Sequence, residues 1–129
     1  MQIVVDSSVV VKWLVVEPYT PEARRILHDY QRGVLDLRAP DLIYAEVGNV
    51  VWKKHLFQGM TAADAQLIID TFRLLTIRLT PTASLLDMAY RLAVTHRRTV
   101  YDMLYVALSL QAQCHFVSAD EKLVSHRCA

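Results

Sequence analysis

Four acidic residues stand where a carboxylate can do chemistry. Asp6 ends the apolar run IVVD near the start of the chain, and the others lie in DLIYAEVGNVVWKK (Glu46), TVYDMLYVALS (Asp102) and HFVSADEKLV (Asp120). Carboxylates that share a pocket repel one another, so they call for a cation. Oxygen ligands without a His or Cys cluster suit Mg²⁺ or Mn²⁺ rather than zinc. Such an ion activates water and stabilises charge on phosphate oxygens, which makes phosphodiester hydrolysis the chemistry that this set favours.

The hydrophobic pattern predicts strands that alternate with helices. Strands are expected at 2–5, 35–39, 76–80 and 115–117, and helices at 7–16, 20–33, 40–59, 61–75, 83–96 and 99–113, with a final short helix after residue 117. Strands separated by helices pair in parallel through right-handed crossovers. The expected fold class is therefore α/β, with helices packed on a mostly parallel sheet.

This arrangement brings the acids toward one edge of the sheet. Ligands of parallel sheets gather outside the carboxyl ends of the strands, and Asp6 and Asp120 each follow a predicted strand. Asp102 falls in the first turn of a predicted helix. Glu46 lies inside a helix, with Leu42 and Ile43 one turn before it, so its carboxylate lies on the apolar stripe and needs a partner.

Helix capping is the alternative explanation for two of the acids. Thr99 and Asp102 have the spacing of a capping box, and Ser118 and Glu121 have it around Asp120. Either pattern alone is explained more simply by a helix start than by a metal site.

The other two acids differ in how well capping explains them. Asp6 can cap the helix that follows, although Ser7 or Ser8 is also suited to that position. Glu46 has no lysine three or four residues away, so a structural ion pair along its own helix is the weakest of these alternatives.

Composition limits the classes of protein that fit. The 129 residues are 53% hydrophobic with a mean hydropathy of +0.22, which predicts one domain over 1–129. The 14 basic and 13 acidic side chains give no strong positive field for nucleic acid. Two cysteines, Cys114 and Cys128, form no disulfide framework. With neither a signal-peptide pattern nor a long apolar run, a cytoplasmic protein with no membrane contact is expected.

The acidic segments also occur in a familiar order. The motifs D-S-S, A-E-V-G-N, Y-D-M-L-Y-V-A-L and F-V-S-A-D-E-K-L together resemble the PIN-domain ribonucleases, in particular the VapC toxins of prokaryotic toxin–antitoxin modules. The resemblance covers essentially the whole chain. It implies a three-layer α/β/α sandwich and a metal-dependent endoribonuclease that is often dimeric and is inhibited by a cognate antitoxin.

The resemblance also assigns roles to individual residues. Asp6, Glu46 and Asp102 match the acidic triad of the family and Asp120 its fourth acid, while supporting positions fall at Ser7, Asn49 and Ser118. These acids are expected to hold one or two Mg²⁺ or Mn²⁺ ions. Metal-activated water would then hydrolyse RNA and leave 5′-phosphate and 3′-hydroxyl ends.

Two other functions stay open. One is a PIN-like RNA-binding or RNA-processing protein that is not a toxin. The other is a receiver-type signalling domain, which is disfavoured because Ser7 and Ser8 follow Asp6 where a second acid is expected.

Side chains outside the acidic set carry further expectations. The first helix, VVVKWLVV, is apolar nearly all round, so Trp13 or Leu14 is expected to remain uncovered and to face an antitoxin. Trp13 and Trp52 are expected to pack in the core or at an interface rather than to stack on bases, whereas Arg98 is expected on the solvated surface.

Overall fold

The structure, a computed structural model, describes residues 1–15 and 21–118, with the side chains of 21–24 left aside. The predicted last helix and Asp120 lie outside these ranges. The elements are β1 (Gln2–Val5), α1 (Ser7–Leu14), α2 (Pro21–Gln31), β2 (Asp36–Pro40), α3 (Ile43–Phe57), α4 (Ala62–Arg73), β3 (Ile77–Thr80), α5 (Thr82–His96), α6 (Val100–Ala112) and β4 (His115–Val117). They follow the predicted order, with ends shifted by a few residues.

The strands form one parallel sheet in the order β3-β2-β1-β4. The chain steps from β1 outward to β2 and β3, and then returns to place β4 on the other side of β1. A crevice forms where a parallel sheet reverses its direction of growth in this way. The carboxyl ends of β1 and β4 therefore mark the expected place for a ligand.

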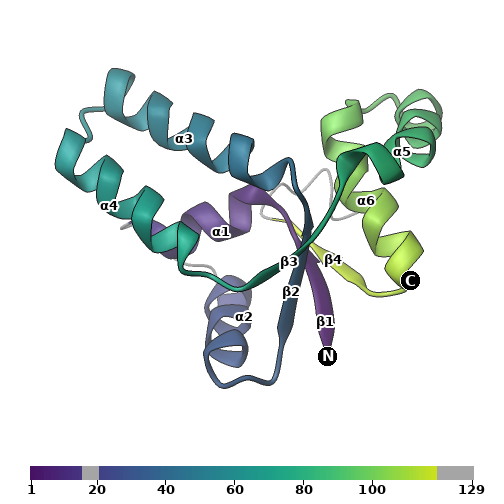
Figure 1. Ribbon diagram of the computed structural model, residues 1–129, viewed down its shortest axis with the longest axis horizontal. Coiled ribbons are helices and arrows are strands. Elements are labelled where there is room, and N and C mark those ends of the chain that lie inside the picture. Colours follow the sequence, from purple (N-terminus) through teal and green to yellow (C-terminus); the bar gives the residue numbers. More distant parts are fainter. Residues whose placement is uncertain (16–20, 119–129) are drawn as a thin grey trace.

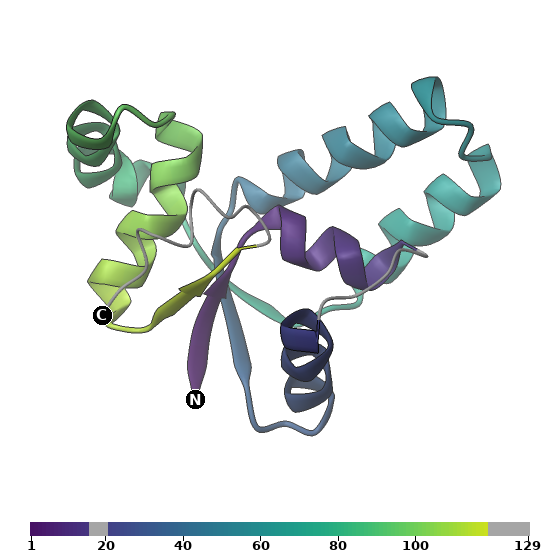
Figure 2. The same cartoon turned by 180° about the vertical axis from the view of Figure 1, so that it is seen from behind.

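Helices cover both faces of this sheet, as the sequence predicts. Figures 1 and 2 show α1, α3 and α4 together on one side and α5 with α6 on the other. No helix in the described ranges combines the length and the apolar character that crossing a membrane requires.

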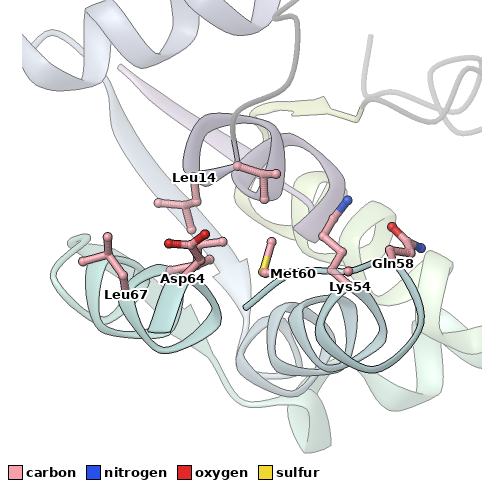
Figure 3. A pocket seen from close by; sticks show the side chains of 9 residues that line it. Leu14, Lys54, Gln58, Met60, Asp64 and Leu67 are labelled. Atoms are coloured by element: carbon pink, nitrogen blue, oxygen red, sulfur yellow. The ribbon is translucent and has the colours of Figure 1, made fainter. Parts of the chain in front are cut away.

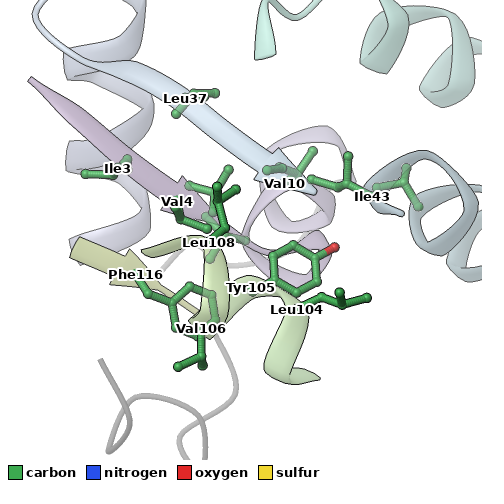
Figure 4. Packing of buried hydrophobic residues seen from close by; sticks show 14 of the residues in the cluster. Ile3, Val4, Val10, Leu37, Ile43, Leu104, Tyr105, Val106, Leu108 and Phe116 are labelled. Atoms are coloured by element: carbon green, nitrogen blue, oxygen red, sulfur yellow. The ribbon is translucent and has the colours of Figure 1, made fainter. Parts of the chain in front are cut away.

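The core extends over both faces of the sheet, with α1, α3 and α4 packed on one side and α6 on the other (Figure 4). Residues from Met103 to Ser109 are buried without interruption, because the sheet covers one side of α6 and α5 another. Phe116 of β4 is fully buried on the face that α6 covers, where its ring stacks on Tyr105. Leu37 of β2 is also fully buried, but it pairs with Ile3 and lies on the opposite face of the sheet. A helix that is packed on most of its circumference gives a rigid support to any side chain that it carries toward the edge of the sheet.

Capping residues fix where the helices begin. Thr61 and Thr99 each accept a hydrogen bond from the backbone N–H three residues later, as predicted for α4 and α6. The expectation of Ser7 or Ser8 as the cap of α1 is wrong. Asp6 is the cap: its backbone is extended and its carboxylate accepts from Val9 N at 3.2 Å.

The two tryptophans differ in exposure. Trp13 is only 7% exposed, because α2, α3 and α4 pack against α1, so the predicted packing of Trp13 is confirmed and the expectation that it stays uncovered is wrong. Trp52 is 50% exposed on α3 and contacts Phe57 edge to face, with ring centroids 5.7 Å apart. Trp52 therefore does not pack in the core, and a role at an interface stays a prediction.

Candidate active site

Strand register places Asp6 beside Ser118. Val5 pairs with Val117 in the parallel ladder, so the residues that follow the two strands lie side by side at the sheet edge. Ser118 Oγ donates a short hydrogen bond to Asp6 Oδ2, and Ser8 Oγ donates to Oδ1 at 2.5 Å. Ser118, which was predicted as a supporting residue, thus contacts Asp6 directly.

Asp6 is buried, and its surroundings shift the pKa of its carboxylate in opposite directions. Burial raises the pKa of Asp6, while the hydrogen bonds from Ser118, Ser8 and the α1 backbone lower it. Burial is the larger effect, so the pKa is raised overall. An acid at the end of a buried strand is therefore kept ionised only with help from its donors or from a cation.

Glu46 is half-buried near the start of α3 and has a tyrosine as its partner. Tyr105 of α6 donates a short hydrogen bond from its hydroxyl to Glu46 Oε1. The sequence predicted that this carboxylate needs a partner, and the partner in the described structure is a neutral hydroxyl from a different helix.

The charge on Glu46 responds to two other acids. Burial raises the pKa of Glu46, the Tyr105 hydroxyl lowers it, and repulsion from Asp6 and Asp102 raises it again. Repulsion of this kind requires the three carboxylates to lie near one another. Acids that are far apart in the sequence thus lie close enough for their charges to interact.

Asp102 is held differently. Its carboxylate forms an ion pair with Arg98 at 3.6 Å, and the side chains are 35% and 17% exposed, respectively. The backbone N–H of Asp102 also donates to Thr99 Oγ1, as the capping alternative requires. Capping and convergence with Glu46 are therefore compatible, because capping uses the backbone N–H and leaves the carboxylate to face its neighbours.

The other predicted site residues have no described hydrogen bond to the three acids. Ser7 hydrogen-bonds to Tyr105 rather than capping α1, and Asn49 has an exposed side chain one turn after Glu46. Asp120 lies outside the described residues. Among the side chains that are described, no three His, Cys, Asp or Glu are arranged to hold one metal ion together.

Sequence reasoning missed Ser8 as a partner of Asp6, Tyr105 as a partner of Glu46, and Arg98 as a partner of Asp102. The expectation of a solvated Arg98 is wrong, because its side chain is only 17% exposed and pairs with Asp102. Arg97, just before it, takes a left-handed conformation (φ 54°) and ends α5. Tyr105 carried a usable signal, since it lies three residues after Asp102 and so on the same side of α6.

Comparison with known proteins identifies the fold and the class. A family model described as the PIN domain matches residues 3–127. The chain belongs to the PIN-domain family. Ribonuclease VapC3 from Pyrobaculum aerophilum is 30% identical over 95% of this chain and 92% of its own length. This PIN domain is therefore a VapC-type ribonuclease, the toxin class of toxin–antitoxin modules, as its motifs predicted.

Solved structures agree with the PIN-domain fold. The crystal structure of PAE2754 from Pyrobaculum aerophilum superposes with a TM-score of 0.72 at 21% identity, covering 97% of this chain and 78% of that one. VapC20 from Mycobacterium tuberculosis, described as a toxin that cleaves the sarcin–ricin loop, gives a TM-score of 0.70 at 16% identity over 95% and 93%. The three-layer α/β/α sandwich is confirmed, and the receiver-type alternative is wrong.

Proposed function

We propose that this PIN domain hydrolyses RNA phosphodiesters at a Mg²⁺ or Mn²⁺ centre held by Asp6, Glu46 and Asp102, with Asp120 as a fourth acid. One observation carries the proposal. Tyr105, three residues after Asp102 on α6, donates to Glu46 on α3 and hydrogen-bonds with Ser7 next to Asp6, so the elements that carry the three acids meet at one place. The charges of Asp6 and Asp102 also raise the pKa of Glu46, and a divalent cation would relieve this repulsion.

The donor set fits a hard cation. All of the donors are carboxylate oxygens, and Mg²⁺ takes one or two carboxylates together with water and substrate phosphate. Each acid now accepts from its own partner: hydroxyls for Asp6 and Glu46, and Arg98 for Asp102. Such partners orient ligand carboxylates without occupying every lone pair, and a site with one or two direct carboxylates does not require three at bonding distance.

The protein's own residues would prepare the reaction. A bound divalent ion supplies charge stabilisation and lowers the pKa of water. Asp6, fixed by Ser8, Ser118 and Val9 N, provides the most rigid carboxylate of the three. Because water rather than the ribose 2′-hydroxyl is the nucleophile, the products should carry 5′-phosphate and 3′-hydroxyl ends.

Cleavage of a panel of structured RNAs tests this function. Wild type and Asp6→Asn are incubated with Mn²⁺, with Mg²⁺ or with chelator, and the ends of every product are mapped. We expect metal-dependent cuts that Asp6→Asn loses, because the amide keeps the helix cap but removes the charge.

Asp87→Asn is the matched control, because Asp87 is an exposed acid paired with Arg91 on α5. It should cleave like wild type. Cuts that survive chelation or that end in 2′,3′-cyclic phosphate would contradict the proposed mechanism. RNA binding without any cleavage would favour the non-catalytic alternative.

We propose that a cognate antitoxin binds a groove at the far end of α1. Leu14 and Val15 line it together with Met60 and, from α4, Leu67 and Ile68, and its volume is about 490 Å³ (Figure 3). The eight residues of α1 connect it to Asp6, a span of about 12 Å at 1.5 Å per residue. A segment of the antitoxin in this groove could extend a basic side chain to the acids.

Leu67→Asp tests the groove, whereas a substitution at Trp13 of α1 would disturb the core, because Trp13 is buried. Leu67 is 64% exposed, so the change should weaken antitoxin binding and spare the nuclease. Leu74→Asp is the control, since Leu74 is 82% exposed and does not line the groove. Equal antitoxin affinity for both variants would exclude this surface.

We propose that the protein forms a homodimer through α5. Leu86, Tyr90 and Val94 are exposed apolar side chains spaced four residues apart, which places them on one side of that helix. Sedimentation of wild type should show a dimer, and Val94→Asp should shift it toward monomer. A monomeric wild type at tens of micromolar would contradict this proposal.

A further inference from the structure

Tyr105 connects the elements that carry the three acids. It lies on α6 three residues after Asp102, and it is buried. Its ring stacks on Phe116 of β4 with the centroids 6.1 Å apart and an interplanar angle of 23°. In Figure 4 the hydroxyl lies on the side of the ring away from Phe116. The ring is therefore fixed by the core and presents one polar atom outside it.

That hydroxyl contacts two other elements. It donates to Glu46 Oε1 on α3, and a hydrogen bond with Ser7 on α1 acts on the same oxygen. Asp6 directly precedes α1, and Asp102 shares α6 with Tyr105. A single buried oxygen thus connects the three helices at which the acids are positioned.

The phenol remains a donor to Glu46. A tyrosine hydroxyl ordinarily titrates at about pH 10, so it keeps its proton at neutral pH and donates it to Glu46 Oε1. A neutral donor can lie among carboxylates without adding to their repulsion.

We infer that Tyr105 is a positioning residue that orients the Glu46 carboxylate for the divalent cation of the active site. This inference rests on the proposed function and extends it to a residue outside the acidic set. A glutamate side chain has several rotatable bonds, and its hydrogen bond to a hydroxyl fixed by ring stacking selects one orientation. Partners of this kind commonly change metal affinity by about 10- to 100-fold when they are removed.

Tyr105→Phe removes the oxygen and keeps the ring stacked on Phe116. The matched control is Tyr101→Phe on the same helix, where the side chain is 62% exposed. Binding of Mn²⁺ alone, without RNA, is measured by electron paramagnetic resonance, and melting in chelator checks the fold. We expect about 10- to 100-fold weaker Mn²⁺ binding for Tyr105→Phe and wild-type binding for Tyr101→Phe.

The activity should follow the lost affinity. Cleavage by Tyr105→Phe should approach the wild-type rate as Mn²⁺ is raised, because mass action restores occupancy of the site. A purely structural role for the hydroxyl would lower the rate at every Mn²⁺ concentration and would leave the Mn²⁺ affinity of the folded protein unchanged.

Two results separate failure of this inference from failure of the proposed function. A wild type that binds no Mn²⁺ contradicts the metal centre itself. A wild type that binds Mn²⁺ with the same affinity as Tyr105→Phe overturns only the role of Tyr105. In a Glu46→Gln background no carboxylate is left to orient, so Tyr105→Phe should cause no further loss. A further loss of the same size there would also overturn the inference, even if either variant is less stable.

Discussion

Glu46 and Asp102 carry the same functional group and lie near one another, but different partners hold their carboxylates. Glu46 is half-buried on α3 and accepts from the neutral hydroxyl of Tyr105. Asp102 is partly exposed on α6 and is paired with the charged side chain of Arg98. One acid is thus oriented without being neutralised, and the other is neutralised by the protein itself.

The difference shows where the fold leaves charge uncompensated. Asp6 resembles Glu46, since serine hydroxyls and a backbone N–H hold it, and the pKa values of both acids are raised by burial. Hydroxyls orient a carboxylate but do not cancel its charge. We expect a cation to be drawn most strongly toward Asp6 and Glu46, with Asp102 completing the site.

The largest expected effect is on cleavage, where the two acids should behave alike. Glu46→Gln and Asp102→Asn should each lower the rate of RNA cleavage roughly a thousandfold, because charge stabilisation of several kcal/mol is removed. Initial rates in Mn²⁺ measure this effect. A full rate for Asp102→Asn would mean that Arg98, rather than a metal, is the functional partner of that acid.

Stability should separate the same two variants. Glu46→Gln should raise the free energy of unfolding in chelator by roughly 1 kcal/mol, because it removes a buried charge that is repelled by its neighbours. Asp102→Asn should lower it by up to about 1 kcal/mol, because Arg98 loses its anion. Urea denaturation gives both values, and changes of the same sign would break the distinction between the two acids.

The dependence of stability on pH isolates the buried acids. The pKa values of Asp6 and Glu46 are raised in the folded state above 3.8 and 4.5. The folded protein therefore binds these protons more tightly than the unfolded chain does. Their stabilising contribution is complete below those values and is lost as the pH rises through the raised folded pKa values.

Urea denaturation in chelator should accordingly show wild type losing stability, relative to the Asp6→Asn/Glu46→Gln double variant, as the pH rises from 4.5 toward neutral. The comparison cancels the titration of other groups. A difference between the two proteins that grows in favour of wild type as the pH rises would have the wrong sign for acids whose pKa values are raised.

A stability effect of similar size is expected at the hydroxyls around Asp6. Ser8→Ala removes one donor to its carboxylate and should lower the free energy of unfolding at pH 7 by about 1 kcal/mol. Ser84→Ala is a control, since that hydroxyl bonds only a backbone carbonyl on the exposed start of α5 among the contacts described. If Ser84→Ala lowered the free energy of unfolding more than Ser8→Ala does, the hydrogen bond from Ser8 to Asp6 would not be the source of the stabilisation.

The strand and helix order could be predicted from the sequence because it depends on local patterns. The β-branched run of β1, the proline that precedes α5, and the threonines that cap α4 and α6 each act within a few residues. The placement of Asp6 at a strand end was equally predictable, since the position outside a parallel strand follows from alternation of strands and helices.

The partners of the acids could not be predicted in the same way, because they depend on packing between distant elements. The contact of Asp6 with Ser118 spans 112 positions and follows from the β1–β4 register. The contact of Glu46 with Tyr105 requires helices from the two sides of the sheet, α3 and α6, to meet at its edge. Trp13 and Trp52 show the same limit, because which face of a helix is covered depends on its neighbours.

A crystal structure with bound Mn²⁺, analysed by anomalous scattering, would locate the proposed metal centre. We expect an anomalous peak coordinated by Asp6 and Glu46 or Asp102, near the carboxyl ends of β1 and β4. A protein saturated with Mn²⁺ that shows no peak there, or a peak on a different part of the surface, would contradict the proposed metal centre.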